Sequence, residues 1–235
     1  AVEIDGSPAV GADAGEAAGI PKTGITVTDS LGKVIGNCDV VIDFTSPEST
    51  VANAVIAAKS GKSLVIGTTG LDAKQLAKIK EFSKKISIVL SPNMSLGVNL
   101  LFKLVQEVAK AVPDYDVEIV EVHHRFKKDA PSGTAKKIAE LIAEAKKQNL
   151  DAVGIYGRKG LVGARKKGEI GILAVRAGDV VGEHTVIFCG LGERLEIVHK
   201  AHNRDSLARG AVTAARFACK ARPGIHDMKE VLGLK

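Results

Sequence analysis

A short segment near the middle of the chain combines residue types suited to proton transfer and to anion binding. His123, His124 and Lys127 lie close together, and Ser132-Gly133-Thr134 follows where a helix is expected to begin. An imidazole exchanges protons near neutral pH. The free N–H groups and the dipole of a helix N-terminus attract carboxylates. The segment therefore predicts an acid catalyst beside a site for a small carboxylate, although a capped helix alone would also explain Ser132.

A strand over 117–123 must deliver the two histidines, and a helix over 132–147 must follow them. Neighbouring strand residues point to opposite faces, so His123 and His124 are not expected to share a metal ion. No Cys, Asp or Glu completes a ligand set at metal-binding spacing, and no metal site is predicted.

The chain before this segment alternates short apolar runs with helical patterns. Strands are expected at 39–44, 63–66 and 86–90, with helices after them from Thr45, over 71–85 and over 97–112. Thr45 and Glu48 have the spacing of a capping box. This order predicts a doubly wound parallel sheet whose ligand lies at the carboxyl ends of its strands.

Two loops follow strands at that expected ligand edge. They are Gly67-Thr68-Thr69-Gly70 and Ser91-Pro92-Asn93-Met94-Ser95. Small residues at such junctions let a backbone approach a flat ligand, although a tight turn also favours glycine. Two loops at one edge indicate a shared ligand.

The later chain favours a different sheet. Segments 169–176, 183–189 and 194–200 are strand-like, follow one another through Gly-rich turns and are expected to be antiparallel neighbours. The predicted fold is α/β: a Rossmann-like doubly wound parallel sheet plus an α+β domain with a mixed, largely antiparallel sheet. We expect residues 1–94 and 204–235 to form the dinucleotide-type domain, and 95–203 the substrate-binding and oligomerisation domain.

Composition narrows the function classes. The 235 residues are 45% hydrophobic and 3% aromatic, carry a net charge of +6 and contain three widely spaced cysteines. The charge favours anionic partners, but the scarcity of aromatic residues argues against nucleic acid. The basic, Gly-rich segment 157–168 is interpreted as a solvated mobile loop that could close over a small anion. No membrane span or secretory signal is visible, and the cysteines suit a reducing cytoplasm.

Glu3 could be the acid that holds ribose hydroxyls at the end of a second strand. The first strand and the Gly-rich pyrophosphate loop that precede such an acid are not in this sequence. Read alone, Glu3 would more simply be a surface carboxylate.

The longest motif resembles a known family. Glu118-Ile-Val-Glu-Val-His-His-Arg-Phe-Lys-Lys-Asp-Ala-Pro-Ser-Gly-Thr-Ala135 is similar to the signature of the dihydrodipicolinate reductases (4-hydroxy-tetrahydrodipicolinate reductases). Further matches run along the whole chain: Val41–Thr45, Gly67–Gly70, Ser91–Ser95, Gly97–Asn99, Arg176–Thr185, Ala201–Arg204 and Asp227–Gly233.

The resemblance implies reduction of a cyclic imine dicarboxylate to tetrahydrodipicolinate with NADH or NADPH, in lysine and diaminopimelate biosynthesis, by a cytoplasmic homotetramer. By position, His123 is implied to be the proton donor and Lys127 its assistant. Substrate carboxylates are implied to bind His124, Ser132, Gly133 and Thr134. The implied cofactor contacts are Glu3, Phe44, Gly67, Thr68, Thr69, Ser91, Pro92, Asn93 and Met94. Ile4 stands where many members carry Arg, which favours NADH.

Three alternatives remain open on sequence. Another two-domain nicotinamide dehydrogenase would have a similar build, but no Cys here has the setting of a semialdehyde dehydrogenase nucleophile. A chain without a nucleotide loop could be a truncated, non-catalytic dicarboxylate binder. A basic nucleic-acid binder would show steeply salt-dependent affinity.

Overall fold

The computed structural model describes residues 1–234 as two compact units. Unit 1 comprises Ala1–Pro92 and Val212–Asp227. Unit 2 comprises Asn93–Ala211 and the chain from Met228 onward. The expectation that 204–235 belongs wholly with the first domain therefore differs from the structure. Residues 204–211 belong to unit 2, and the last helix packs on a helix of that unit.

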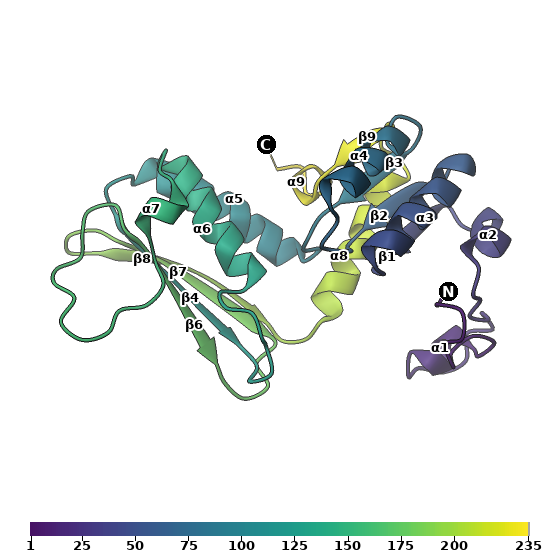
Figure 1. The fold of residues 1–235 in the computed structure, drawn as a ribbon, viewed down its shortest axis with the longest axis horizontal. Helices are drawn as coiled ribbons and strands as arrows, with labels where there is room; N and C mark the ends of the chain where they lie inside the picture. The colour runs from purple at the N-terminus through teal and green to yellow at the C-terminus, as the bar shows by residue number, and fades with distance from the viewer. Residues whose placement is uncertain (235) are drawn as a thin grey trace. The chain divides into compact units, whose positions relative to one another are not determined.

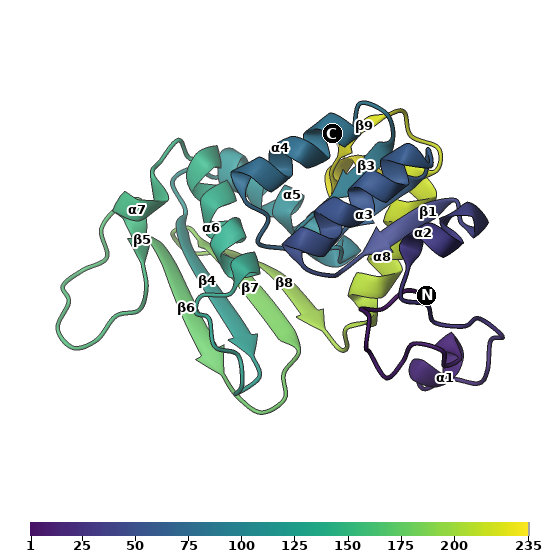
Figure 2. The ribbon, with the colours of Figure 1, turned by 45° about the vertical axis from the view of Figure 1, so that its right-hand side comes forward.

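Unit 1 is built on a parallel sheet in the order β1-β2-β3-β9, with β1 at Val40–Asp43, β2 at Ser63–Ile66, β3 at Ser87–Leu90 and β9 at Gly224–His226. Helices α3 (Pro47–Lys59) and α4 (Ala73–Phe82) lie together over one face of it (Figures 1 and 2). Leu64, Val65 and Ile66 of β2 and Ile88 and Val89 of β3 are fully buried, as is usual for inner strands of a parallel sheet.

The rest of unit 1 is shorter or irregular. It includes α1 (Ala14–Ala17), α2 (Leu31–Val34), a 3₁₀ turn η1 (Ile35–Asn37) and the second half of α8 (Asp205–Ala218). The Ser63 hydroxyl donates to the Ala218 carbonyl at 3.0 Å, which ties the end of α8 to β2. Strand β9 was not predicted, because three residues are too few to show an alternating pattern.

The predicted capping box at Thr45 was wrong. Ser46 caps α3 instead, with its hydroxyl accepting from Ser49 N–H, and Pro47 occupies the first turn. The Thr45 hydroxyl donates a hydrogen bond to Asp43 Oδ1 at 2.7 Å. The Thr45 hydroxyl is thus engaged by the residue two positions before it, and the cap falls to Ser46.

Unit 2 contains a mixed sheet in the order β5-β6-β4-β7-β8. The strands are β4 (Asp116–His123), β5 (Gly154–Ile155), β6 (Ile170–Arg176), β7 (Gly182–Cys189) and β8 (Arg194–Ala201). The β4/β7 and β7/β8 pairs are antiparallel, whereas β4/β6 and β5/β6 are parallel. The expectation that 169–176 and 183–189 are neighbours was wrong, because β4 lies between them.

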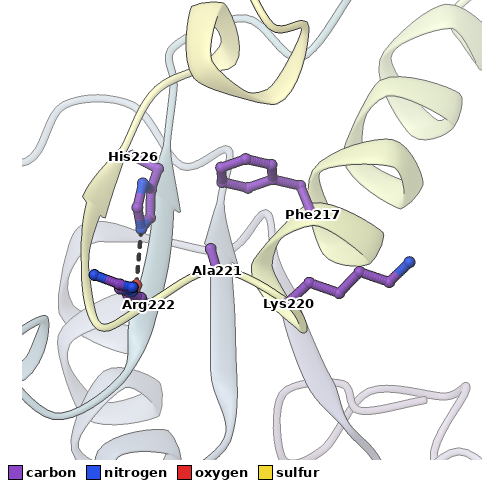
Figure 3. Close-up of a pocket in the computed structure, with 5 residues that line it drawn as sticks. All are labelled: Phe217, Lys220, Ala221, Arg222 and His226. Atoms are coloured by element: carbon purple, nitrogen blue, oxygen red, sulfur yellow. Dashed lines mark hydrogen bonds between the residues drawn. The ribbon is translucent and has the colours of Figure 1, made fainter.

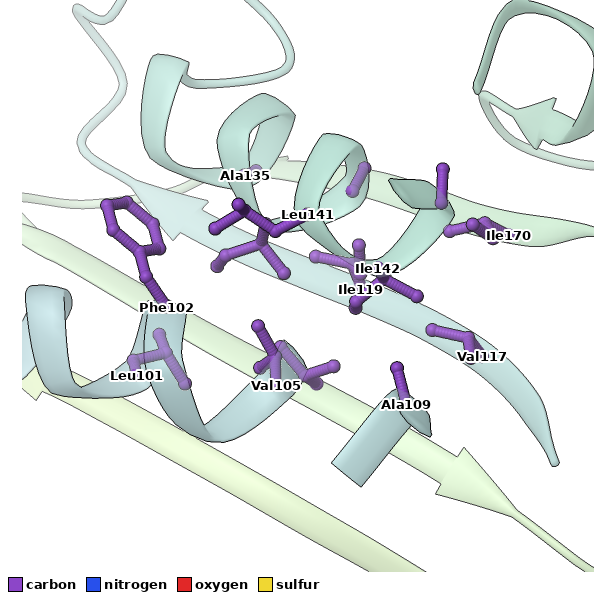
Figure 4. Packing of buried hydrophobic residues seen from close by; sticks show 14 of the residues in the cluster. Leu101, Phe102, Val105, Ala109, Val117, Ile119, Ala135, Leu141, Ile142 and Ile170 are labelled. Atoms are coloured by element: carbon purple, nitrogen blue, oxygen red, sulfur yellow. The ribbon is translucent and has the colours of Figure 1, made fainter. Parts of the chain in front are cut away.

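Helices α5 (Leu96–Ala111) and α6 (Gly133–Ala145) pack on one face of that sheet, and α7 (Leu150–Val153) follows α6 (Figures 1 and 2). Figure 4 shows Leu101, Val105, Ile119 and Ile142 meeting between the helices and the strands. The last helix, α9 (Met228–Val231), packs on α5, and Lys229 Nζ donates to Gln106 Oε1 at 3.3 Å. This buried core makes the end of β4 and the start of α6 rigid supports.

Candidate active site

The residues predicted to do chemistry come together in unit 2, at the carboxyl end of β4 and the start of α6. His123 is the last residue of β4, and Ser132 is the N-cap of α6, as predicted, with its hydroxyl accepting from Ala135 N–H. In the first turn of a helix the N–H groups have no partner within the helix. Gly133 and Thr134 therefore direct backbone donors outward from this end.

A buried carboxylate joins His123 to the start of α6. Glu121 is 0% exposed, and its Oε2 lies 2.6 Å from His123 Nδ1. Its Oε1 accepts from Ser132 N–H at 3.0 Å. Arg176 of β6 donates to both oxygens, from Nη2 to Oε1 and from Nη1 to Oε2, each at 2.8 Å.

Burial by itself would raise the pKa of Glu121. The hydrogen bonds from Arg176, His123 and Ser132 outweigh it and hold that pKa below its usual value. The carboxylate is therefore ionised beside the imidazole at neutral pH.

His184 of β7 lies behind His123, with ring centroids 5.4 Å apart in an edge-to-face arrangement. Its Nε2 is 3.2 Å from Ser132 Oγ. Burial first, and then the neighbouring His123, lower the pKa of His184 to about 4. His184 is therefore neutral at cellular pH. His199 of β8 lies next to it, with ring centroids 6.5 Å apart, and burial lowers its pKa as well.

Lys127 and His124 lie in the loop between β4 and α6. Lys127 Nζ pairs with Asp129 Oδ1 at 2.9 Å, and this hydrogen bond is the largest cause that lowers the pKa of Asp129. Arg176 Nη2 also donates to the Asp129 carbonyl at 2.7 Å, which fixes the loop. His124 Nδ1 is buried and has no hydrogen-bond partner among the described residues.

The predicted cofactor contacts of unit 1 gather at the carboxyl edge of its parallel sheet. Phe44 follows β1, Gly67 follows β2 and Ser91 follows β3, so parallel pairing brings the three loops to one edge. The Phe44 side chain is 51% exposed and packs so closely on Gly67 that an added Cβ would lie 2.1 Å from the ring. An exposed aromatic face beside backbone donors fits a nicotinamide-type ring and its amide.

Asp43 organises this edge. It is 2% exposed and accepts hydrogen bonds from Thr45 N–H, from the hydroxyls of Thr45, Thr50 and Thr68, and from the Asn53 amide, over 2.7 to 3.0 Å. Thr68 is thereby buried and fixed, while Thr69 and Pro92 are exposed.

The remaining predicted cofactor residues differ in setting. Glu3 is exposed, and its carboxylate accepts from Ile4 N–H at 3.2 Å. Asn93 belongs to unit 2, where its amide contacts Thr134 Oγ1 at 3.3 Å. Met94 is 1% exposed, so it belongs to the core and offers almost no surface for a contact.

The basic segment 157–168 is less free than expected. Arg158 pairs with Glu118 at 3.0 Å and Glu169 at 3.2 Å, and Arg165 pairs with Glu118 and Asp116. Half-buried ion pairs thus fix the segment to the sheet at two points.

A separate hollow of about 370 Å³ lies in unit 1 between the end of α8 and β9. Figure 3 shows Phe217 and His226 facing one another across it, with Lys220 and Arg222 at its rim. None of the predicted site residues lines this hollow.

Four residues that organise these sites were not assigned a role from sequence: Glu121, Arg176, His184 and Asp43. Glu121 could have been found, because residues two apart on a strand share a face and a Glu between valines on the inward face of β4 is unusual. Arg176 and His184 could not have been found from the sequence. Only the strand register places Arg176 opposite His123 and His184 opposite Glu121.

Among the described residues, no group of three or more His, Cys, Asp or Glu side chains could hold a metal ion. No helix in residues 1–234 is long and apolar enough to cross a bilayer.

The parallel-sheet unit with its open carboxyl edge and the histidine-bearing mixed-sheet unit define a two-domain nicotinamide-type oxidoreductase. The family models for the N-terminus and C-terminus of dihydrodipicolinate reductase match residues 1–94 and 97–232. The 4-hydroxy-tetrahydrodipicolinate reductase of Syntrophus aciditrophicus (strain SB) is 53% identical over 235 residues, covering 100% of this chain and 88% of the relative. That of Hahella chejuensis is 51% identical, over 98% of this chain and 86% of the relative.

Solved structures with a similar fold include a member of the same family. Dipicolinate-bound dihydrodipicolinate reductase from Paenisporosarcina sp. TG-14 is 28% identical, with a TM-score of 0.76 over 97% of this chain and 87% of that one. An amine dehydrogenase from Mycobacterium smegmatis shares the fold, with a TM-score of 0.56 at 12% identity over 96% of this chain and 86% of that one. The chain belongs to the dihydrodipicolinate reductase family, whose NAD(P)H-dependent reaction is the reduction step in lysine and diaminopimelate biosynthesis.

Proposed function

We propose that this protein reduces 4-hydroxy-tetrahydrodipicolinate to tetrahydrodipicolinate, with His123 as the proton donor. The observation that carries the proposal is the Glu121–His123 pair fixed next to the N-terminus of α6. It places an imidazole beside backbone donors suited to a carboxylate, which are the two groups that reduction of a dicarboxylate ring requires.

In the proposed reaction the substrate loses water, and its ring then gains a hydride at C4 and a proton. Bound NAD(P)H supplies the hydride. The Phe44 face and the backbone of Gly67, Thr68, Thr69, Ser91 and Pro92 would hold the nicotinamide, with Asn93 and Met94 at the start of unit 2. His123 gives up the proton from Nε2, because Nδ1 is engaged by Glu121.

Substrate recognition falls to the positive end of α6 and the cations near it. Gly133 and Thr134 donate backbone N–H groups to one carboxylate, and Ser132 keeps the helix start in place. The second carboxylate, or the reacting nitrogen, is bound by His124 and Lys127. The Nδ1 of His124 has no partner in the described residues and is available for this contact. For Lys127, substrate must compete with Asp129 for the ammonium.

Replacing His123 tests the assignment. His123→Gln should lower kcat by about 100-fold or more while NADH still binds, because acid catalysis contributes that much. The exposed His202→Gln is the matched control and should keep full turnover. Wild-type turnover in His123→Gln would refute the role. Lys127→Ala should lower kcat and raise KM for the substrate together.

Thermal shift separates the enzyme from a non-catalytic dicarboxylate binder. The melting temperature should rise with NADH and, separately, with pyridine-2,6-dicarboxylate. A response to the dicarboxylate alone would favour the binder.

We further propose a preference for NADH. Glu3 is an exposed acid suited to ribose hydroxyls, and the neighbouring Ile4 offers no cation for a 2′-phosphate. kcat/KM should be higher with NADH than with NADPH, and Ile4→Arg should shift the ratio toward NADPH. A clear NADPH preference in the wild type would contradict this.

A cytoplasmic homotetramer is the proposed assembly. Helices cover one face of the mixed sheet, and on the other face Leu173, Val175 and Val198 are 36%, 40% and 48% exposed. Charged neighbours there are already paired, as Lys200 is with Glu183. A second copy would bury this apolar stripe. Light scattering should give four times the chain mass, and Val198→Asp should lower it; a monomeric wild type would refute the proposal.

A further inference from the structure

Glu121 is a fully buried ionisable group of the site, and the proposed reaction does not by itself explain it. It stands in the middle of β4 between Val120 and Val122, facing the helices with no exposed surface. A carboxylate is rarely buried unless it is paired, because its desolvation is costly. Here its two oxygens accept four hydrogen bonds, from Arg176 twice, His123 and Ser132.

Those four hydrogen bonds come from three separate elements. Arg176 belongs to β6, His123 to the end of β4 and Ser132 to the cap of α6. The same guanidinium also holds the Asp129 carbonyl in the intervening loop. One carboxylate therefore fixes the imidazole, the helix start and, through Arg176, the loop that carries Lys127.

The contact with His123 also selects the reactive nitrogen. A carboxylate 2.6 Å from Nδ1 accepts the proton there, so the neutral imidazole presents an unprotonated Nε2. Gly182 of β7 leaves room for that ring edge, since an added Cβ would lie 3.1 Å from Nε2.

We propose that Glu121 is a positioning residue of the reductase: it fixes the His123 tautomer through Nδ1 and holds the carboxylate-binding start of α6 in register with it. The proposal rests on the proposed role of His123 as proton donor. Arg176 completes this arrangement, because its guanidinium balances the buried charge of Glu121. The carboxylate therefore does not take the proton from His123 Nδ1.

The other ionisable groups near His123 are consistent with this role of Glu121. His184 of β7 is neutral at cellular pH because burial lowers its pKa, and His199 of β8 lies behind it. Lys127 and Asp129 form their own ion pair in the loop. Glu121 is thus the negative charge in direct contact with the His123 ring.

Kinetics of Glu121→Gln test the proposal. The variant keeps the shape of the side chain but loses its charge, so kcat should fall by about 10-fold or more, and less than in His123→Gln. KM for NADH should stay nearly unchanged, because every hydrogen-bond partner of Glu121 lies in unit 2. Glu118→Gln is the matched control: it lies on the same strand, faces the other side and pairs with Arg158, and should leave both readouts unchanged.

If Glu121→Gln fails to fold, a measurement on the wild type still tests whether Glu121 fixes the His123 tautomer. Long-range ¹⁵N NMR of His123 at alkaline pH should show the neutral ring protonated on Nδ1. Protonation on Nε2 would overturn the proposal. Arg176→Lys, which retains the charge, should fold and show an intermediate loss of kcat.

The two failures are distinguishable. If His123→Gln loses turnover while Glu121→Gln keeps kcat, the positioning role is refuted and the proposed reaction stands. If His123→Gln keeps turnover, the proposed function fails first, and the NMR result alone decides whether Glu121 fixes the ring.

Discussion

Two buried carboxylates, Asp43 in unit 1 and Glu121 in unit 2, each organise a predicted half of the site, but with opposite kinds of partner. Asp43 accepts from a backbone N–H, three hydroxyls and an amide, all neutral and most of them within 10 residues along the chain. Glu121 accepts from a guanidinium and an imidazole as well as a backbone N–H. The neutral donors around Asp43 fix the loops at the carboxyl edge of unit 1. The charged and titratable donors around Glu121 make the geometry of that cluster depend on the protonation of its members.

The difference suits the two proposed tasks. A cofactor edge needs a rigid surface whose shape does not change with pH. A proton donor needs a partner whose charge responds to its own. Substitutions at the partners of the two carboxylates test this difference between the two units.

Arg176→Ala should have the largest effect on stability. It leaves Glu121 buried without its cation, and uncompensated buried charges cost about 3–5 kcal/mol. Urea unfolding measures the loss. The control is Arg194→Ala, which removes an exposed pair with Glu196 and should cost under about 1 kcal/mol. Equal losses in the two variants would mean that Arg176 does not balance a buried charge.

The stability of the wild type should decrease as pH falls from about 6.5 to about 4. His184 has a pKa of about 4 in the folded chain against 6.5 when unfolded, so in this window the unfolded state binds the extra proton. The loss amounts to about 3 kcal/mol, and His199 adds to it in the same direction.

Urea unfolding as a function of pH checks this, with His184→Gln showing a flatter profile and the exposed His202→Gln an unchanged one. Below this window the depressed pKa of Glu121 adds a second decrease as that carboxylate is protonated. A His184→Gln profile as steep as the wild type would contradict the assignment.

Gly182→Ala should reduce activity while leaving the fold nearly intact. The added Cβ would lie 3.1 Å from His123 Nε2, so the ring must shift away from Gly182. We expect kcat to fall by about 10-fold, about 1.4 kcal/mol in the barrier. Gly36→Ala, where nothing lies within 4 Å of the added Cβ, serves as the control. Steady-state kinetics with unchanged turnover in Gly182→Ala would show that the His123 position tolerates displacement.

Thr68→Val should produce the smallest effect. It removes a hydroxyl that donates to Asp43 at 3.0 Å and accepts from Thr45 N–H and the Thr50 hydroxyl, each at 2.9 Å, so the Gly67–Thr69 loop loosens although Asp43 keeps its other donors. KM for NADH should rise several-fold with kcat nearly unchanged, because hydrogen bonds of this kind contribute about 1 kcal/mol each and none of them reaches the reacting atoms. Thr68→Ser keeps the hydroxyl and should behave as the wild type. A larger effect on kcat than on KM would place the Asp43 cluster in the chemical step.

The elements that carry the sites could be predicted from local sequence patterns. The parallel strands 39–44, 63–66 and 86–90, the strand ending at His123 and the cap at Ser132 follow from local apolar periodicity and capping chemistry. These signals span a few residues, so they survive without knowledge of the fold.

The partners that hold those residues in place became visible in the folded sheet. The placement of β4 between β6 and β7 brought Arg176 opposite His123 and His184 opposite Glu121, although both lie more than 50 residues further along the chain. The same long-range pairing gave Glu121 its cation and lowered the pKa of His184. Strand register and burial are properties of the packed sheet, and no local pattern of residues encodes them.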